Sequence, residues 1–577
     1  MSTLRDALTR ADAGLARTGT TGRGLAVLGG LAAAGSAFLR WTYDPSFGGD
    51  LTLSGSPGGS QWWTLVLGLL TAAGAVLAAR ARPGGAGRVA GATRATRVAG
   101  AARAAAGFGL VLMVLTAVEI TVSLGGTANL APGAWLGLAG ALLAAVGSRA
   151  LTGTATSGAL GTPSARRRPP LLEAAVVVAG IAACVYLASV LLGQAVPVLF
   201  IALAVFVAGV VVVLRRLGVT SWFSVLSGRH RTVTAVAALA GAAVFPFTQH
   251  GNDTNMSIAY QILVFASAAI GLNIVIGYAG LLDLGYVAFV GAGAYTAAIL
   301  SGAPSAPSWW HPPFLVAFLL GGLVSSILGV LIGLPTLRLR GDYLAIVTLA
   351  FGEIFHTLVN NLDGASGPSV TGGSNGIFAI GSVKVGGFDF DTTHRLFGVP
   401  ITLFSNYYFL LLVLVAAIVF AVGRVSRSRI GRAWVAIRED ETAAEAMGIS
   451  TYRLKLLAFA GGALLAGFGG AIRPHVDTAV APDSYVFEQS TLLVAAVVLG
   501  GMGNIPGVIL GSTVLALLPE KLRFLQDHRL LVFGLALIIV MRFKPEGLLP
   551  STRRRLELHT DTDEAPLVTV TTSGAAL

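Results

Sequence analysis

The chain has 577 residues, of which 54% are hydrophobic and only 11% are charged, whereas about a quarter of the residues are charged in an ordinary soluble domain. Its repeated apolar runs, each of roughly 17 to 25 residues, are long enough to cross a hydrocarbon core as helices. The short alternating segments of a membrane β-barrel do not occur in the sequence. The composition therefore excludes a soluble enzyme and predicts an all-α integral membrane protein, a polytopic helical bundle.

The formal net charge of +12 comes from basic residues in short loops between the apolar runs. No aromatic-interleaved basic face accompanies them, so they predict membrane topology and no nucleic-acid partner. The single cysteine, Cys184, excludes an internal disulfide and a cysteine-based metal cluster. It is predicted to be a small buried apolar residue.

Residues 1–230 are predicted to form an N-terminal membrane extension of about six helices. The polar N-terminus carries four arginines and is predicted to be cytoplasmic, with the first apolar run retained as a membrane anchor. Arginine-rich loops then alternate with loops that hold no Lys or Arg. The expected spans lie near residues 24–40, 62–79, 104–124, 132–148, 171–193 and 196–214.

Residues 231–550 differ in composition from residues 1–230, with polar residues at membrane depth and glycine-rich segments. Residues 278–302 predict close helix packing or a broken, re-entrant path. The segment 362–405 is predicted to be an external loop with possible short strands.

The last part of the chain leaves the topology open at one place. The run 489–519 is either one span or two short helices broken at "LGGMGNIPG", and its glycines favour the break, which returns the C-terminus to the cytoplasm. A last span is expected near 529–543, and residues 551–577 are predicted to be a disordered cytoplasmic tail. Including broken or re-entrant helices, about 13 to 15 membrane segments are expected.

Motifs for hydrolysing a nucleotide are absent from the sequence. There is no Gly-x-x-x-x-Gly-Lys-[Ser/Thr] loop, and no Gly-Lys pair occurs anywhere. His-Glu-x-x-His and Gly-x-Ser-x-Gly are also absent. The sequence therefore predicts no catalytic residue, no metal site and no ATPase site in this chain.

The stretch "GRAWVAIREDETAAEAMGIS", residues 431–450, is a charged insertion that arginine counting places in the cytoplasm. Asp440 is predicted to cap a short helix of one or two turns that Gly448 closes in a left-handed conformation. An apolar ridge flanked by acids would then suit a groove on another protein: Ala443, Ala444 and Met447, with Glu441 and Glu445. The alternative is a solvated helix that links two spans.

Six motifs in order carry a resemblance to a known family. They are "GYAGLLDLGYVAFVGAGAY", "LRLRGDYLAIVTLAFGEI", "TGGSNGI", the stretch at 431–450, "LLVAAVVLGGMGNIPGV" and "FKPEGLLP". Across about 232–550 the chain closely resembles the permease subunits of branched-chain amino acid ABC transporters, the LivM type. The first 230 residues have no counterpart in a minimal member.

The resemblance implies an importer of leucine, isoleucine and valine in a bacterial cell membrane. Arginine counting, with the run 489–519 broken, places both termini of this chain in the cytoplasm. The implied partners are a second homologous permease of the LivH type, two ATPase subunits of the LivG and LivF types, and an external substrate-binding protein. ATP and Mg would be used by the partner ATPase, and no cofactor is expected on this chain.

The resemblance also implies that residues 431–450 dock in a cleft of the ATPase. The candidate coupling residues are Arg438, Glu439, Asp440, Glu441, Ala443, Ala444, Glu445, Ala446, Met447 and Gly448.

Four polar residues at membrane depth are expected to line or support the translocation path: Asn273, Glu353, His356 and Asn360. The last three are spaced i, i+3 and i+7, which places them on one helical face. Polar groups in a membrane helix are costly unless they face a bundle or a cavity. Packing and interhelical hydrogen bonding are alternative roles for each of them.

Three other functions are compatible with parts of the sequence. Permeases for urea or short amides are related, and the external binding protein largely sets the substrate. An ion-gradient-driven secondary transporter would use Glu353 and His356 as a proton relay. A non-transporting scaffold would account for the N-terminal helices, but neither it nor a secondary transporter explains the acidic helix.

Overall fold

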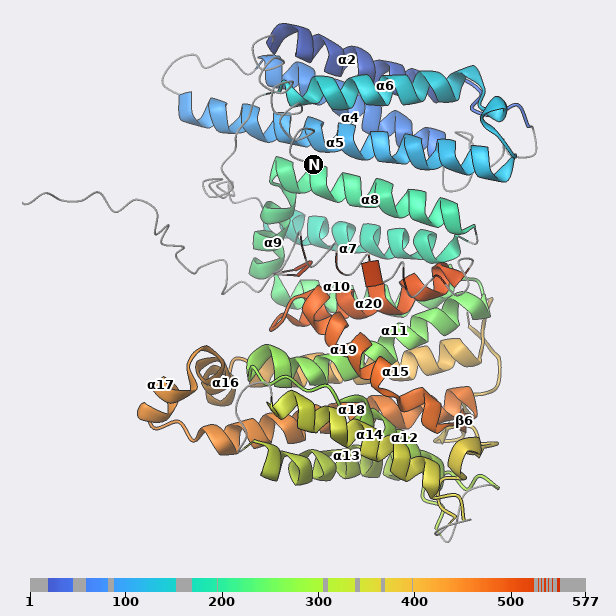
Figure 1. Ribbon diagram of the computed structural model, residues 1–577, viewed down its shortest axis with the longest axis vertical. Helices are drawn as coiled ribbons and strands as arrows, with labels where there is room; N and C mark the ends of the chain where they lie inside the picture. Colours follow the sequence, from blue (N-terminus) through green and yellow to red (C-terminus); the bar gives the residue numbers. More distant parts are fainter. Residues whose placement is uncertain are drawn as a thin grey trace, which may run out of the picture. The chain divides into compact units, whose positions relative to one another are not determined.

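The computed structural model describes most of the chain (Figure 1). The described residues are 19–44, 59–80, 88–151, 169–194, 196–304, 310–337, 343–364, 369–396 and 398–523, with scattered residues between 528 and 549. Within them, ten helices are long and apolar enough to cross a membrane, and three two-stranded sheets are present. The prediction of an all-α polytopic membrane protein is confirmed.

The chain divides into two compact units, Met1–His250 and Gly251–Leu577. Small residues bring the first four helices of the first unit together: a Cβ at Gly30 would lie 2.8 Å from the carbonyl oxygen of Gly68. The helices of this unit are α2 (Gly19–Ser36), α4 (Ser60–Arg80), α5 (Arg88–Ser123), α6 (Pro132–Arg149), α7 (Pro170–Gly193), α8 (Pro197–Leu217), α9 (Val219–Arg229) and α10 (Arg231–Thr248), with the 3-10 turn η1 (Thr127–Asn129).

Three details of the first unit differ from the sequence predictions. Helix α5 begins at Arg88 and not near residue 104, because alanine and arginine favour helix and continue it beyond the apolar run. Helix α9 was not predicted; Gly218, with φ +84°, ends α8 and begins α9. Cys184 is exposed on α7, so the prediction that it is buried was wrong; only part of the α7 surface packs against other helices.

The second unit is built around the long helix α18 (Thr451–Asp477), which packs against α11, α12 and α13 (Figure 1). Its other helices are α11 (Asp253–Leu272), the π-helix η2 (Asn273–Tyr278), α12 (Val287–Leu300), α13 (Phe314–Thr336), α14 (Tyr343–Asn361), α15 (Leu403–Val425), α16 (Arg429–Glu439), α17 (Glu441–Ala446), α19 (Phe487–Gly500) and α20 (Ile505–Lys521). Among the described residues of this unit there are also two 3-10 turns, η3 (Gly373–Asn375) and η4 (Pro482–Tyr485).

Glycines let the neighbours of α18 approach closely. A Cβ at Gly467 would lie 2.8 Å from the carbonyl oxygen of Gly321 on α13, and one at Gly470 would overlap the carbonyl oxygen of Val290 on α12. Lipid tails are as apolar as the side chains of membrane helices, so no hydrophobic force drives the helices together. They associate instead through close packing, which small residues allow. The position of α18 among its neighbours therefore depends on residues without side chains.

The segment between α14 and α15 carries short strands, as predicted. Strands β2 (Lys384–Val385) and β3 (Phe388–Asp389) form one hairpin, and β4 (His394–Leu396) and β5 (Val399–Ile401) form another. Strand β1 (Ile377–Phe378) pairs with β6 (Ala479–Val480), which directly follows α18. This pairing attaches the segment to the end of α18.

The run 489–519 forms two short helices, α19 and α20, so the broken alternative is confirmed. Gly501 and Gly503, with φ values of +116° and +77°, make the turn between them. Helix α12 is likewise short and follows an irregular segment after η2. The predicted last span near 529–543 lies largely outside the described residues, and the predicted tail 551–577 lies wholly outside them.

Candidate functional site

Helix α16 lies against the end of α18 where the chain enters that helix (Figure 1). The hydroxyl of Ser428 caps its first turn by accepting the N–H of Gly431 at 3.5 Å. Trp434 is buried, and its indole N–H donates to the carbonyl oxygen of Leu454 at 2.7 Å. Arg432 lies on the exposed side. Helix α16 is therefore amphipathic and is fixed to α18 by a buried tryptophan.

Helix α17 follows after one residue, and its predicted caps are confirmed. Asp440 accepts the N–H of Ala443 on Oδ1 at 3.0 Å. Gly448 has φ +81°, a left-handed conformation that glycine adopts without strain. Because both ends of α17 are defined by residues within or next to the helix, its shape depends little on the rest of the protein.

One face of α17 packs on the bundle. Glu441 accepts a hydrogen bond from Lys455 at 2.5 Å, and Glu445 accepts one from Thr451 at 2.7 Å. These contacts turn both acids toward α18, and Ala444, on the same side, is only 4% exposed. The prediction that Ala444 belongs to an exposed ridge was therefore wrong.

The opposite face of α17 is exposed. Met447 is 82% exposed, and Ala443 and Ala446 are also exposed. Glu439 lies beside them, exposed, at the end of α16. The accessible part of the candidate coupling segment is thus a small apolar patch centred on Met447 with an acid at its edge.

Replacing Asp440 with alanine should unravel the first turn of α17. Loss of an N-cap costs about 1 kcal/mol, and asparagine is an equally good cap. The exchange rate of the Ala443 amide hydrogen should rise roughly fivefold or more in Asp440→Ala and stay near the wild-type value in Asp440→Asn. Equal exchange rates in all three proteins would show that the cap does not hold the helix.

Arg438, at the end of α16, points into the bundle. One of its terminal amino groups donates to the carbonyl oxygen of Gly277 in η2 at 2.7 Å, and the other binds Glu439 at 2.6 Å. Its aliphatic part packs on Gly280, where the backbone has φ +74° and a Cβ would collide with the Arg438 side chain. Arg438 therefore connects the candidate coupling segment to the end of α11.

The same end of α11 contacts the turn between α19 and α20. Asn273 is wholly buried, and its Oδ1 accepts the N–H of Gly503 at 2.8 Å. A Cβ at Gly503 would lie 3.3 Å from the carbonyl oxygen of Gly277, which is the one that Arg438 binds. We call Arg438, Gly277, Asn273 and Gly503 the Arg438 cluster. It joins α16, η2 and the α19–α20 turn.

The other three residues predicted for the translocation path lie on α14. Glu353 and Asn360 are exposed, and His356 is partly buried. The Nε2 atom of His356 lies 3.8 Å from a carboxylate oxygen of Asp483, too far for a hydrogen bond. Asn273 belongs to the Arg438 cluster and not to this face. The role of the four residues in the path stays a prediction.

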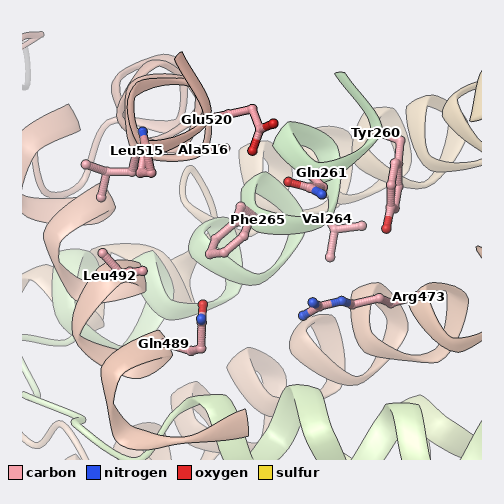
Figure 2. A pocket seen from close by; sticks show the side chains of 11 residues that line it. Tyr260, Gln261, Val264, Phe265, Arg473, Gln489, Leu492, Leu515, Ala516 and Glu520 are labelled. Carbon is pink, nitrogen blue, oxygen red and sulfur yellow. The ribbon is translucent and has the colours of Figure 1, made fainter. Parts of the chain in front are cut away.

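A cavity of about 220 Å³ lies between α11, α18, α19 and α20 (Figure 2). The sequence predictions missed it, although a charged residue at the end of an apolar run, Arg473, was a signal for a functional site. The lining residues are Tyr260, Gln261, Val264, Phe265, Arg473, Gln489, Leu492, Leu515, Ala516, Pro519 and Glu520.

Hydrogen bonds orient Arg473 at the wall of this cavity. Its Nε–H donates to one carboxylate oxygen of Asp477 at 3.1 Å, and the hydroxyl of Tyr260 donates to the other at 2.5 Å. The guanidinium group lies 5.9 Å from the ring centre of Tyr485. Burial raises the pKa of Tyr485 to about 12, so this residue stays neutral at physiological pH.

Among the described residues, no group of three or more His, Cys, Asp or Glu side chains could hold a metal ion. That this chain binds no cofactor stays a prediction.

The chain is similar to proteins of one transport family. A family model described as "Branched-chain amino acid transport system / permease component" matches residues 254–541. The high-affinity branched-chain amino acid transport system permease protein LivM of Salmonella typhimurium is 39% identical over 335 residues, which cover 56% of this chain and 76% of that protein. LivM of Escherichia coli K12 is 38% identical, with the same coverage.

A shorter similarity extends to a second kind of permease. The high-affinity branched-chain amino acid transport system permease protein LivH of Escherichia coli K12 is 32% identical over 125 residues, 21% of this chain and 40% of that protein. No solved structure matches the chain. From the match to the family model and to the LivM proteins, the chain belongs to the family of permease components of branched-chain amino acid transport systems.

Proposed function

We propose that this chain is the LivM-type permease subunit of an ATP-driven importer of leucine, isoleucine and valine. The observation that carries the proposal is the capped helix α17, which presents an exposed apolar patch and is joined through Arg438 to the helix bundle. The similarity to LivM proteins over most of their length supports the substrate class.

An ATPase subunit docks on the exposed face of α17 in this proposal. Its contacts are the Met447 patch and the acid at its edge, Glu439, whereas Glu441, Ala444 and Glu445 hold the helix to the bundle. ATP and Mg bind to that partner. The exposed face of α17 is small, and the partner recognises the shape of a helix that is already formed. Docking therefore orders few additional residues and loses little conformational entropy.

The Arg438 cluster transmits the movement of the ATPase. When ATP closes the ATPase dimer, α16 and α17 are displaced, and Arg438 carries the displacement to the carbonyl of Gly277 in η2. Asn273 passes it to the turn at Gly503. A small shift at a packed contact becomes a switch between two arrangements because packed helices do not deform continuously.

A second permease of the LivH type completes the path in this proposal. The similarity to LivH shows that the two kinds of permease share sequence features. On α14 the exposed Glu353 and Asn360 support an aqueous path or a subunit contact at that face, since a carboxylate facing hydrocarbon is costly. An external substrate-binding protein delivers the amino acid, and the assembly lies in a bacterial cell membrane with both termini of this chain cytoplasmic.

Uptake of labelled leucine tests the proposal against the alternatives. Cells that lack their own branched-chain amino acid transporters would express this chain with its ATPases, second permease and binding protein. Uptake should continue when an ionophore collapses the proton gradient while ATP is maintained, and it should stop when ATP is depleted. Uptake of urea in place of leucine would contradict the substrate, and loss of uptake with the gradient alone would contradict the energy source.

A further inference from the structure

The cavity between α11, α18, α19 and α20 has the composition of a site for a small polar molecule with an apolar part. Polar groups approach it from different helices: Gln261 from α11, Arg473 from α18, Gln489 from α19 and Glu520 from α20 (Figure 2). Apolar side chains fill the space between them, namely Val264, Phe265, Leu492 and Leu515. Ligand sites typically combine apolar walls with a few such convergent polar groups.

Arg473 has binding capacity that the protein does not use. Its Nε–H is occupied by Asp477, which Tyr260 also holds, while its two terminal amino groups point toward the cavity in Figure 2. Among the described residues neither amino group has a hydrogen bond. Arg473 lies near the C-terminal end of the span formed by α18, and the two parallel N–H donors of a guanidinium group match a carboxylate.

The dimensions of the cavity favour a metabolite of few atoms. Its volume of about 220 Å³ is below the roughly 300 to 1,000 Å³ of pockets for drug-sized ligands. A smaller cavity of about 20 Å³ shares Val264, Phe265, Arg473 and Gln489 with it and continues toward Val290 on α12. Arg473 and Gln489 therefore lie where the two cavities meet, and apolar side chains line each cavity beside them.

We propose that this cavity binds the transported molecule, an amino acid zwitterion with a branched aliphatic side chain. Arg473 binds its carboxylate. The side-chain oxygens of Gln261 and Gln489 are acceptors for its ammonium group, as is the carboxylate of Glu520, which also pairs with Arg523 at 3.3 Å. Val264, Phe265 and Leu492 pack against its side chain. This assignment rests on the proposed function and adds the place where the substrate is held.

The site is connected to the Arg438 cluster through the helices that form it. Helix α11 contributes Val264 and Phe265 to the cavity and leads into η2, whose first residue, Asn273, lies eight residues and about 12 Å beyond Phe265. Helices α19 and α20 line the cavity and meet at the turn that contains Gly503. A displacement of the cluster therefore changes the spacing of the helices that surround the substrate.

Binding of two ligands to the full-length chain, purified in lipid nanodiscs with the second permease and the ATPases but without the substrate-binding protein, tests the role of Arg473. Leucine and isoamylamine share the side chain and the ammonium group, but isoamylamine has no carboxylate. Arg473→Gln should weaken leucine binding about tenfold or more, and its affinity for isoamylamine should be unchanged. Arg453→Gln, an exposed arginine on the same helix, serves as the matched control. Equal leucine binding by wild type and Arg473→Gln would overturn the site.

Thiol labelling locates the ligand without removing a charged residue. In a Cys184→Ser background, Ala516→Cys places a thiol on the cavity wall and Leu510→Cys places one on an exposed part of α20. Leucine should slow modification of the first severalfold and leave the second unchanged. Equal rates with and without leucine at both positions would overturn the site.

Measuring leucine import by the wild-type assembly and by Arg473→Gln distinguishes an error in the site from an error in the proposed function. If the wild-type assembly imports leucine and Arg473→Gln imports and binds it equally well, the site is wrong and the function stands. If the wild-type assembly does not import leucine, the proposed function is wrong, and with it the ligand assigned to the cavity.

Discussion

Replacing Arg438 with alanine should lower leucine uptake by the assembled transporter at least tenfold and make ATP hydrolysis insensitive to substrate. Arg438 is the side chain that joins the end of α16 to the carbonyl of Gly277. Its loss leaves that carbonyl without its charged donor, at a cost of about 1 to 3 kcal/mol. Since η2 also contacts the α19–α20 turn through Asn273, the ATPase would then move α17 without moving the helices around the cavity.

Two further variants distinguish this effect from general damage. Arg432 lies on the same helix, is exposed, and donates to the carbonyl of Arg427, so Arg432→Ala should keep nearly full uptake. Arg438→Lys keeps the charge but loses the second donor group and should give intermediate uptake. Full substrate-stimulated hydrolysis and uptake in Arg438→Ala would refute the transmission through this residue.

Replacing Gly470 with alanine should strongly destabilise the second unit. The added methyl group would overlap the carbonyl oxygen of Val290, a backbone atom of α12 that cannot move without shifting the helix. Overpacking a close-packed interior costs about 1 to 3 kcal/mol, and more where backbone must move. The same substitution at Gly461, also in α18, meets open space and should be neutral or stabilising by about 0.5 to 1 kcal/mol.

Thermal denaturation of the detergent-solubilised chain, followed by size-exclusion chromatography, measures the difference between these variants. Gly470→Ala should lose its monodisperse peak at a clearly lower temperature than wild type, whereas Gly461→Ala should match or exceed wild type. Indistinguishable curves for the two variants would mean that α12 and α18 are not as close as the structure places them.

The ends of α17 were predictable because they follow from local chemistry. An aspartate that caps an N-terminus and a glycine with positive φ act within a few residues of each other. The burial of Ala444 was not predictable in the same way, because it depends on Lys455 and Thr451 in the following helix. Helix formation is read from neighbours in sequence, but the face that a helix buries is decided by tertiary contacts.

Longer-range contacts explain what the sequence could not predict about the candidate site. Asn273 was recognisable as a polar residue at membrane depth, but its partner, Gly503, lies 230 residues away. Four helices form the walls of the cavity, and among the lining residues only Arg473 was recognisable in the sequence as a candidate for a functional site. The presence of the helices and most of their limits were predictable from apolar runs of membrane length. Which side chains come together was not predictable, because it depends on how the helices pack.

Photo-crosslinking from Met447 tests the central claim most directly. A photoreactive residue in place of Met447, which is 82% exposed at the C-terminal end of α17, should cross-link the assembled transporter to an ATPase subunit. The same residue in place of Phe378 should not; Phe378 is 56% exposed on β1, which pairs with β6, and β6 lies at the end of the second unit opposite α17 (Figure 1). A cross-link to the ATPase from Phe378, or none from Met447 in a transporter that still imports leucine, would contradict docking on α17.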